Sequence, residues 1–188
     1  MEAFFVSVTT ISIAEIGDRT QLLSLVLVAR YRRALPIIAG IFCATLANHA
    51  VAGAVGVWFG NLLRPKVLEI TVGVSMIAMA LWTLKPDKLD ADASPSSAAS
   101  AFVATLTSFF LAEIGDKTQI ATLALAAAYP NLLAVVSGTT LGMLIANVPV
   151  VILGKAFADR LPIKAIHYGA SALFMLLGAL FLGRALWR

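Results

Sequence analysis

Long apolar runs alternate with short polar breaks along nearly the whole chain. A membrane-spanning helix needs about 20 mostly apolar residues, and six segments satisfy this requirement: Phe4–Val28, Leu35–Leu63, Val67–Leu84, Ala101–Ala128, Leu132–Leu153 and Ile163–Leu182. The connections at 30–33, 64–66 and 129–131 are only a few residues long, which is typical of neighbouring antiparallel helices. The pattern therefore predicts an all-α membrane protein with six transmembrane helices.

One polar stretch interrupts this pattern. Residues 85–100, KPDKLDADASPSSAAS, are rich in Ser, Ala and Pro, a composition typical of a flexible linker. The stretch divides the chain into a first three-helix unit at 1–84, the linker itself, and a second three-helix unit at 101–188. We expect the two units to form one integral membrane domain.

The two units repeat one another. AEIGDRTQLLSLVL at 14–27 matches AEIGDKTQIATLAL at 112–125, an offset of 98 residues. Gly40 and Gly138 keep the same offset, and so do Gly56 and Gly154. Because each unit has an odd number of spans, the second unit must enter the membrane from the opposite side. The expected architecture is a pair of inverted three-helix repeats, with a site at the midplane between them.

Composition narrows the class of protein. Hydrophobic residues make up 60% of the chain and charged residues only 13%, which is too apolar for a water-soluble domain. The basic residues stand in short clusters between apolar runs, a pattern of membrane topology and not of nucleic-acid binding. Cys43 is the single cysteine, which excludes an internal disulfide and a thiolate metal site. The N-terminal sequence lacks the features of a cleaved signal, which predicts a retained first helix.

The distribution of Lys and Arg predicts the orientation. The first, third and fifth connections carry eight of them and the opposite side carries four, and the richer side is expected in the cytoplasm. Both termini would then lie outside the cytoplasm and the linker inside, in a bacterial inner membrane. Trp58, Trp82 and Trp187 fall near helix ends, as do Glu69 and His167, where residues of the membrane interface are expected.

Two pairs of acids lie near the middle of apolar segments. Glu15 and Asp18 stand three residues apart, and Glu113 and Asp116 repeat this spacing. In a continuous helix such a spacing places both carboxylates on one face. A charge at this depth costs about 2.5–3.5 kcal/mol, so the acids need a compensating partner. We therefore take these four residues as candidate metal ligands.

The charge balance of the two motifs favours a divalent ion. Four carboxylates carry −4, and Arg19 and Lys117, as charge-balancing residues, add +2. The remaining −2 matches one divalent cation or two protons, so the same site could exchange one for the other. A simpler alternative is that Arg19 and Lys117 form buried salt bridges with the acids of their own motifs and only hold helices together.

Other polar residues near the acids offer hard oxygen donors, which suit Ca²⁺, Mn²⁺ or Mg²⁺ better than Cu⁺ or Zn²⁺. Secondary candidates for metal binding or proton coupling are Thr20, Gln21, Thr118, Gln119, Asn48, Asn147 and His49. Interhelical hydrogen bonding is the alternative for the amide side chains and the histidine. Gly17 and Gly115 permit close packing or local unwinding, while small-residue pairs such as Gly138 and Gly142 predict close helix contacts.

EIGDRT at 15–20 and EIGDKT at 113–118 resemble the E-x-G-D-[KR]-[TS] motif of a family of small membrane proteins. This family comprises the Golgi manganese/calcium transporters of eukaryotes, their chloroplast relatives and bacterial manganese exporters. The resemblance extends over essentially the whole chain, including LWTLKPD at 81–87. It implies transport of Mn²⁺, and in some members Ca²⁺, in exchange for protons. It also implies that the ion is bound by the acids of the two motifs, Glu15, Asp18, Glu113 and Asp116.

We therefore expect a secondary active transporter, not an enzyme: an antiporter that exports Mn²⁺, or Ca²⁺, by alternating access between inverted halves. Its expected partners are the divalent metal ion, protons and the lipid bilayer, with no prosthetic group and no nucleic acid, and a homodimer remains an open alternative. A cation-selective channel and a purely structural membrane protein are alternative functions. An intramembrane aspartyl protease with Asp18 and Asp116 as its dyad is disfavoured, because both motifs carry Glu where such enzymes carry Gly in one motif.

Overall fold

The computed structural model describes residues 1–84, 101–154 and 163–187, and this part of the chain consists of helices and their connections. The helices are α1 (Glu2–Glu15), α2 (Arg19–Tyr31), α3 (Ala34–Leu62), α4 (Pro65–Thr83), α5 (Ala101–Glu113), α6 (Lys117–Ala128), α7 (Leu132–Leu153) and α9 (Ile163–Trp187). The predicted all-α class is confirmed. The predicted linker at 85–100, four of the eight basic residues used for orientation, and the side chains of Trp82 and His167 lie outside the described residues.

Each motif divides one of the predicted spans into two helices. The first motif separates α1 from α2, and the second separates α5 from α6. Gly17 has a φ of +85° and Gly115 a φ of +74°, a left-handed conformation that glycine adopts without the steric penalty of other residues. The spans predicted at 4–28 and 101–128 are thus each divided at the motif, which agrees with the alternative of local unwinding at Gly17 and Gly115. The Glu and Asp of each motif flank a break and do not share one face of a helix.

Helix length separates the long helices from the broken ones. Among the described residues, α3 and α7 are the two helices long and apolar enough to cross a membrane by themselves. Shorter apolar helical stretches cover Arg19–Val28, Ala101–Glu113 and Ser171–Trp187. A broken segment therefore needs both of its helices together to match the length of α3 or α7.

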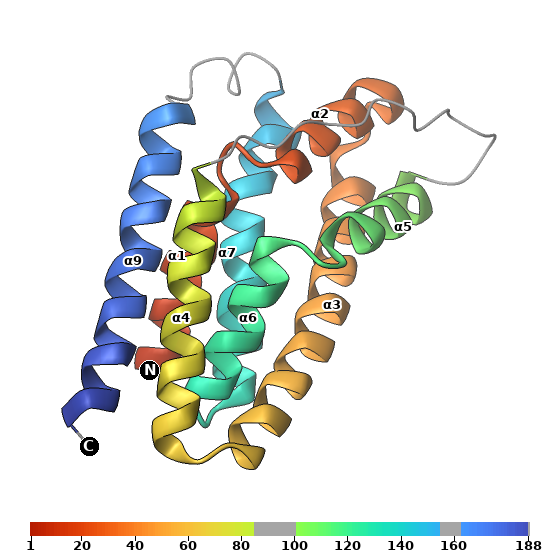
Figure 1. Cartoon of the computed structure of the whole chain (residues 1–188). Helices are drawn as coiled ribbons and strands as arrows, with labels where there is room; N and C mark the ends of the chain where they lie inside the picture. The colour runs from red at the N-terminus through yellow and green to blue at the C-terminus, as the bar shows by residue number, and fades with distance from the viewer. Residues whose placement is uncertain (85–100, 155–162, 188) are drawn as a thin grey trace.

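The helices pack mainly between the two sequence halves. α3 lies against α5 and α6, whereas α7 lies against α1 and α2, and α3 and α7 also contact each other (Figure 1). α4 packs along α9 on another side of the bundle (Figure 1). This interleaving brings two motif breaks that are far apart in sequence close together in space.

Glycines on α3 and α7 allow the helix backbones to approach closely. A Cβ atom built on Gly40 would lie 2.7 Å from the Cβ of Thr105, and one on Gly138 would lie 2.6 Å from the carbonyl oxygen of Phe4. A Cβ on Gly142 would likewise lie 2.8 Å from a carbonyl oxygen of α1. The predicted role of these small residues in close helix packing is confirmed.

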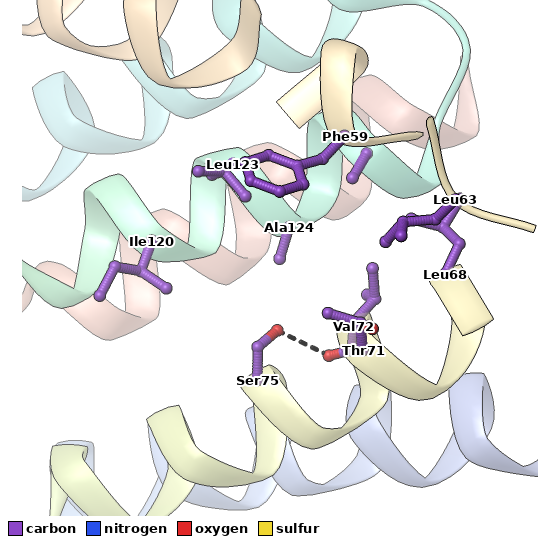
Figure 2. Close-up of a pocket in the computed structure, with 10 residues that line it drawn as sticks. Phe59, Leu63, Leu68, Thr71, Val72, Ser75, Ile120, Leu123 and Ala124 are labelled. Atoms are coloured by element: carbon purple, nitrogen blue, oxygen red, sulfur yellow. Dashed lines mark hydrogen bonds between the residues drawn. The ribbon is translucent and has the colours of Figure 1, made fainter. Parts of the chain in front are cut away.

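An apolar cavity of about 290 Å³ lies between the end of α3, α4 and α6 (Figure 2). Phe59, Leu63 and Leu123 contribute to its walls. The hydroxyl groups of Thr71 and Ser75, which also line it, donate hydrogen bonds to backbone carbonyls of α4 at 2.8 Å. No acid is among its lining residues, so this cavity is separate from the cluster of motif acids.

Candidate functional site

The two motifs form the same local turn. The backbone N–H of Gly17 donates a hydrogen bond to Oε1 of Gln21 at 2.8 Å, and that of Gly115 donates one to Oε1 of Gln119 at 2.8 Å. The aspartate that follows each glycine is the N-cap residue of the next helix and has an extended backbone. Both glutamine oxygens, which we considered as donors to an ion, are thus bonded to the backbone of their own motif.

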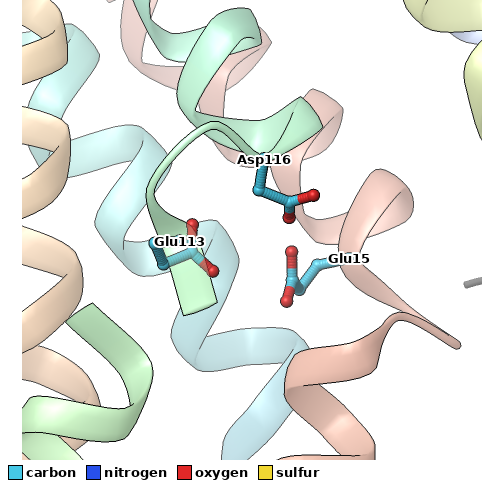
Figure 3. A group of neighbouring side chains, drawn as sticks. All are labelled: Glu15, Glu113 and Asp116. Carbon is cyan, nitrogen blue, oxygen red and sulfur yellow. The ribbon is translucent and has the colours of Figure 1, made fainter. Parts of the chain in front are cut away.

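Three acids from the two breaks converge. Glu15, Glu113 and Asp116 each place a carboxylate oxygen within 4.8 Å of the others, and all three residues are buried (Figure 3). Both carboxylate oxygens of Glu15 and Oε1 of Glu113 are buried without a hydrogen-bond partner among the described residues. Burying such atoms unsatisfied is unfavourable, and a cation bound between the carboxylates would remove this penalty.

The basic residues of the motifs pair between the halves. Nζ of Lys117 lies 2.9 Å from Oδ1 of Asp18, and Nη2 of Arg19 lies 3.2 Å from Oδ1 of Asp116. The two pairs occupy equivalent positions of the repeat. Each basic residue therefore pairs with the acid of the other motif, contrary to the alternative of salt bridges within a motif. The environments differ, since the side chain of Lys117 is 1% exposed and that of Arg19 is 34% exposed.

The four acids of the motifs thus divide into a group of three and an ion-paired aspartate. Asp18 is held by Lys117, while the group of three carries −3 and receives +1 from Arg19. The net charge of this group is −2, the value expected from the sequence for all six charged residues together.

Thr118 connects two of the converging acids. Its hydroxyl donates to Oε2 of Glu113 at 3.0 Å, with a longer contact of 3.4 Å to Oδ2 of Asp116. The equivalent residue of the first motif, Thr20, is fully buried, and its hydroxyl bonds to none of the residues that the structure describes. The two motifs therefore share their backbone turn but differ in their side-chain contacts.

Asparagines of the long helices hold the broken segments in place. Nδ2 of Asn48 donates to the carbonyl oxygen of Phe110 at 2.9 Å, and its Oδ1 accepts a hydrogen bond from Nε2 of Gln119 at 2.9 Å. Oδ1 of Asn147 accepts a hydrogen bond from Ser24 at 3.1 Å. These are the interhelical hydrogen bonds that we considered as the alternative to ion binding. Ser24 was missed by the sequence analysis, and its only signal was a polar residue within an apolar run.

His49 follows Asn48 on α3 and reaches Glu113. Its side chain is fully buried, and Nε2 lies 3.8 Å from Oε2 of Glu113. Neither ring nitrogen has a hydrogen-bond partner in the described part of the chain. The structure therefore brings together three of the four primary candidates, with Thr118 and His49 from the secondary group beside them.

The chain is similar to known proteins over almost its full length. The family description "Divalent cation/proton antiporter GDT1" matches residues 3–91 and 101–187. A protein of Vibrio cholerae with the name "Putative manganese exporter" is 53% identical over 178 residues, which cover 94% of this chain and 88% of the relative. No solved structure matches the chain.

Relatives of lower identity come from Synechocystis and Oryza sativa. GDT1-like protein sll0615 of Synechocystis is 29% identical over 196 residues, which cover 94% of both proteins. GDT1-like protein 3 of Oryza sativa subsp. indica is 25% identical over 201 residues, which cover 93% of this chain and 71% of the relative. Because the family match includes both motifs and both halves, the chain belongs to the divalent cation/proton antiporter GDT1 family of integral membrane cation transporters.

Proposed function

We propose that this protein is a secondary active transporter, and not an enzyme, that exports Mn²⁺ in exchange for protons. The observation that carries this proposal is the group of three buried carboxylates at the meeting point of two helix breaks. Broken helices that place polar groups around an ion are a recurrent feature of secondary transporters. The name of the Vibrio cholerae relative, which specifies manganese, supports Mn²⁺ over Ca²⁺ as the principal substrate.

In this proposal Glu15, Glu113 and Asp116 bind the ion. Their oxygens are hard donors, which suit Mn²⁺, Ca²⁺ or Mg²⁺. The net charge of −2 for these acids with Arg19 is balanced by one divalent ion or by two protons, so either form of the site avoids a large buried charge. Asp18 is neutralised by Lys117 in this conformation and is not a ligand of the ion here.

We further propose that residues 1–84 and 101–188 are inverted repeats with three spans each. Equivalent contacts support this arrangement: Gly40 packs on Thr105, and 98 residues later Gly138 packs on Phe4 and Ser7 of α1. α3 and α7, which occupy equivalent places in the repeat, run in opposite directions in Figure 1, and so do α4 and α9. The first span of each repeat would be the broken one.

In alternating access, the two equivalent ion pairs of the repeat would exchange their accessibility to solvent. The Arg19–Asp116 pair is more accessible than its counterpart, because the side chain of Arg19 is 34% exposed and that of Lys117 is 1% exposed. In the opposite conformation the Lys117–Asp18 pair would become the accessible one. The positive-inside rule favours termini outside the cytoplasm and the linker inside, in a bacterial inner membrane.

The proposal is tested by reconstitution of the full chain into liposomes. Mn²⁺ uptake should increase when the lumen is more acidic than the medium, and each Mn²⁺ taken up should be accompanied by proton release, measured with an external pH dye. Glu113→Gln should abolish both signals. Thr139→Ala is a matched control, because Thr139 is also fully buried but bonds only within α7, and it should retain both signals.

Two results would contradict this function. Mn²⁺ flux that is indifferent to the pH gradient and moves no protons would identify a channel or uniporter. The absence of flux for Mn²⁺ and Ca²⁺ under all gradients, in protein that is folded and monodisperse, would exclude transport.

A further inference from the structure

The imidazole of His49 is buried beside Glu113, and the described residues supply no hydrogen bond to it. Its side chain is 0% exposed, and neither Nδ1 nor Nε2 has a hydrogen-bond partner in residues 1–84, 101–154 and 163–187. Most buried polar groups are hydrogen-bonded, and leaving one unsatisfied costs about 1–3 kcal/mol. The preceding residue, Asn48, satisfies both ends of its side chain with α5 and α6. A ligand absent from the protein itself would account for the unsatisfied imidazole.

The distance from His49 to Glu113 fits two atoms that share one metal ion. Nε2 lies 3.8 Å from Oε2, whereas a hydrogen bond between these atoms would be at most about 3.2 Å. Ca²⁺ and Mg²⁺ hold their ligands at about 2.0–2.6 Å, so two atoms on one ion lie roughly 2.8–5.2 Å apart. The oxygens of the three converging acids lie within 4.8 Å of one another, and His49 adjoins this group at Glu113.

We propose that Nε2 of His49 is a ligand of the transported ion and makes the site prefer Mn²⁺ to Ca²⁺ and Mg²⁺. This inference rests on the proposed function, because the ion is the one bound by Glu15, Glu113 and Asp116. Carboxylates alone suit all three ions, whereas an imidazole nitrogen is a poor ligand for Ca²⁺ and Mg²⁺ and a better one for first-row transition metals.

The same chemistry limits the selectivity. Mn²⁺ is the weakest binder among the first-row divalent transition metals. His49 therefore raises the preference for Mn²⁺ over Ca²⁺ and Mg²⁺ but gives no preference over Co²⁺ or Fe²⁺. Added Co²⁺ should therefore inhibit the transport of labelled Mn²⁺ at least as strongly as an equal concentration of unlabelled Mn²⁺ does.

A spectroscopic experiment tests the bond directly. The purified full chain is loaded with Mn²⁺, and pulsed electron paramagnetic resonance is used to detect modulation of the electron spin echo by the imidazole nitrogen. The chain has two histidines, so labelling with ¹⁵N-histidine and the variants His49→Gln and His167→Gln assign the signal. We expect the modulation in wild type and in His167→Gln, and its loss in His49→Gln. Mn²⁺-loaded wild type without imidazole modulation would overturn the proposal, even if His49→Gln does not fold.

Selectivity provides the second measurement. In proteoliposomes, His49→Gln should reduce the ratio of Mn²⁺ to Ca²⁺ transport efficiency by about tenfold, a typical minimum loss when a metal site is disturbed. His167→Gln should leave the ratio unchanged. A folded His49→Gln variant with the wild-type ratio would overturn the inference while the proposed function stands. Wild-type protein that neither binds nor transports Mn²⁺ would instead refute the proposed function.

Discussion

Substitution of Lys117 by Met should strongly destabilise the protein, because it leaves the Asp18 carboxylate buried without its cation. The two side chains are 1% and 0% exposed, and Nζ lies 2.9 Å from Oδ1. Removing one partner of a buried ion pair costs about 3–5 kcal/mol. Arg19→Met removes the repeat counterpart and should cost less, because a side chain that is 34% exposed keeps part of its hydration and pairs more weakly.

The measurement is the midpoint of thermal unfolding of purified protein in detergent with a metal chelator. For a chain of this size, 1 kcal/mol corresponds to about 2–4 °C, so Lys117→Met should lower the midpoint by roughly 6–20 °C. The double variant Asp18→Asn with Lys117→Met should recover most of this loss, because a neutral amide then replaces the carboxylate that Lys117 balanced. The two single variants and the double variant form a cycle that isolates the interaction of the pair.

Additive losses in this cycle would refute the reasoning, because they would mean that Asp18 and Lys117 contribute independently of each other. A larger loss for Arg19→Met than for Lys117→Met would refute the ranking by burial.

Three further predictions concern the acids and the glycines. Glu15→Gln should raise the midpoint without metal and weaken Mn²⁺ binding, because it removes one of three converging negative charges; a lower metal-free midpoint would contradict this. Gly115→Ala should cost about 1–2 kcal/mol, because its φ is +74° although a Cβ there would have no neighbour within 4 Å. Gly183→Ala, equally open but within α9, is the control and should be neutral or stabilising. Gly138→Ala should lower the unfolding midpoint more than Gly115→Ala does, because the new Cβ at position 138 would lie 2.6 Å from the backbone oxygen of Phe4. Equal midpoints for Gly138→Ala and Gly183→Ala would exclude this close contact.

The unbroken long helices could be located closely from sequence. The spans predicted at Leu35–Leu63 and Leu132–Leu153 agree within one residue with α3 and α7, because charged residues or proline mark their ends. The spans that carry the motifs were located, but the sequence left close packing and local unwinding at Gly17 and Gly115 as alternatives. A glycine in an apolar run is compatible with either helix packing or a helix break, and local sequence does not distinguish them. The break depends on hydrogen bonds that Gln21 and Gln119 supply to the turn and on neighbouring helices that hold both fragments.

The sequence by itself determined the membrane class, the internal repeat, the family resemblance and the residue types available for a cation, because apolar length, charge and motif spacing are properties of the chain alone. Only the tertiary structure decided which acids meet. Glu15, Glu113 and Asp116 converge while Asp18 is held by Lys117, because the helices of one half pack against those of the other and carry each basic residue to the opposite motif. Spacing within a motif cannot contain this information, since the decisive neighbour of Asp18 is 99 residues away along the chain.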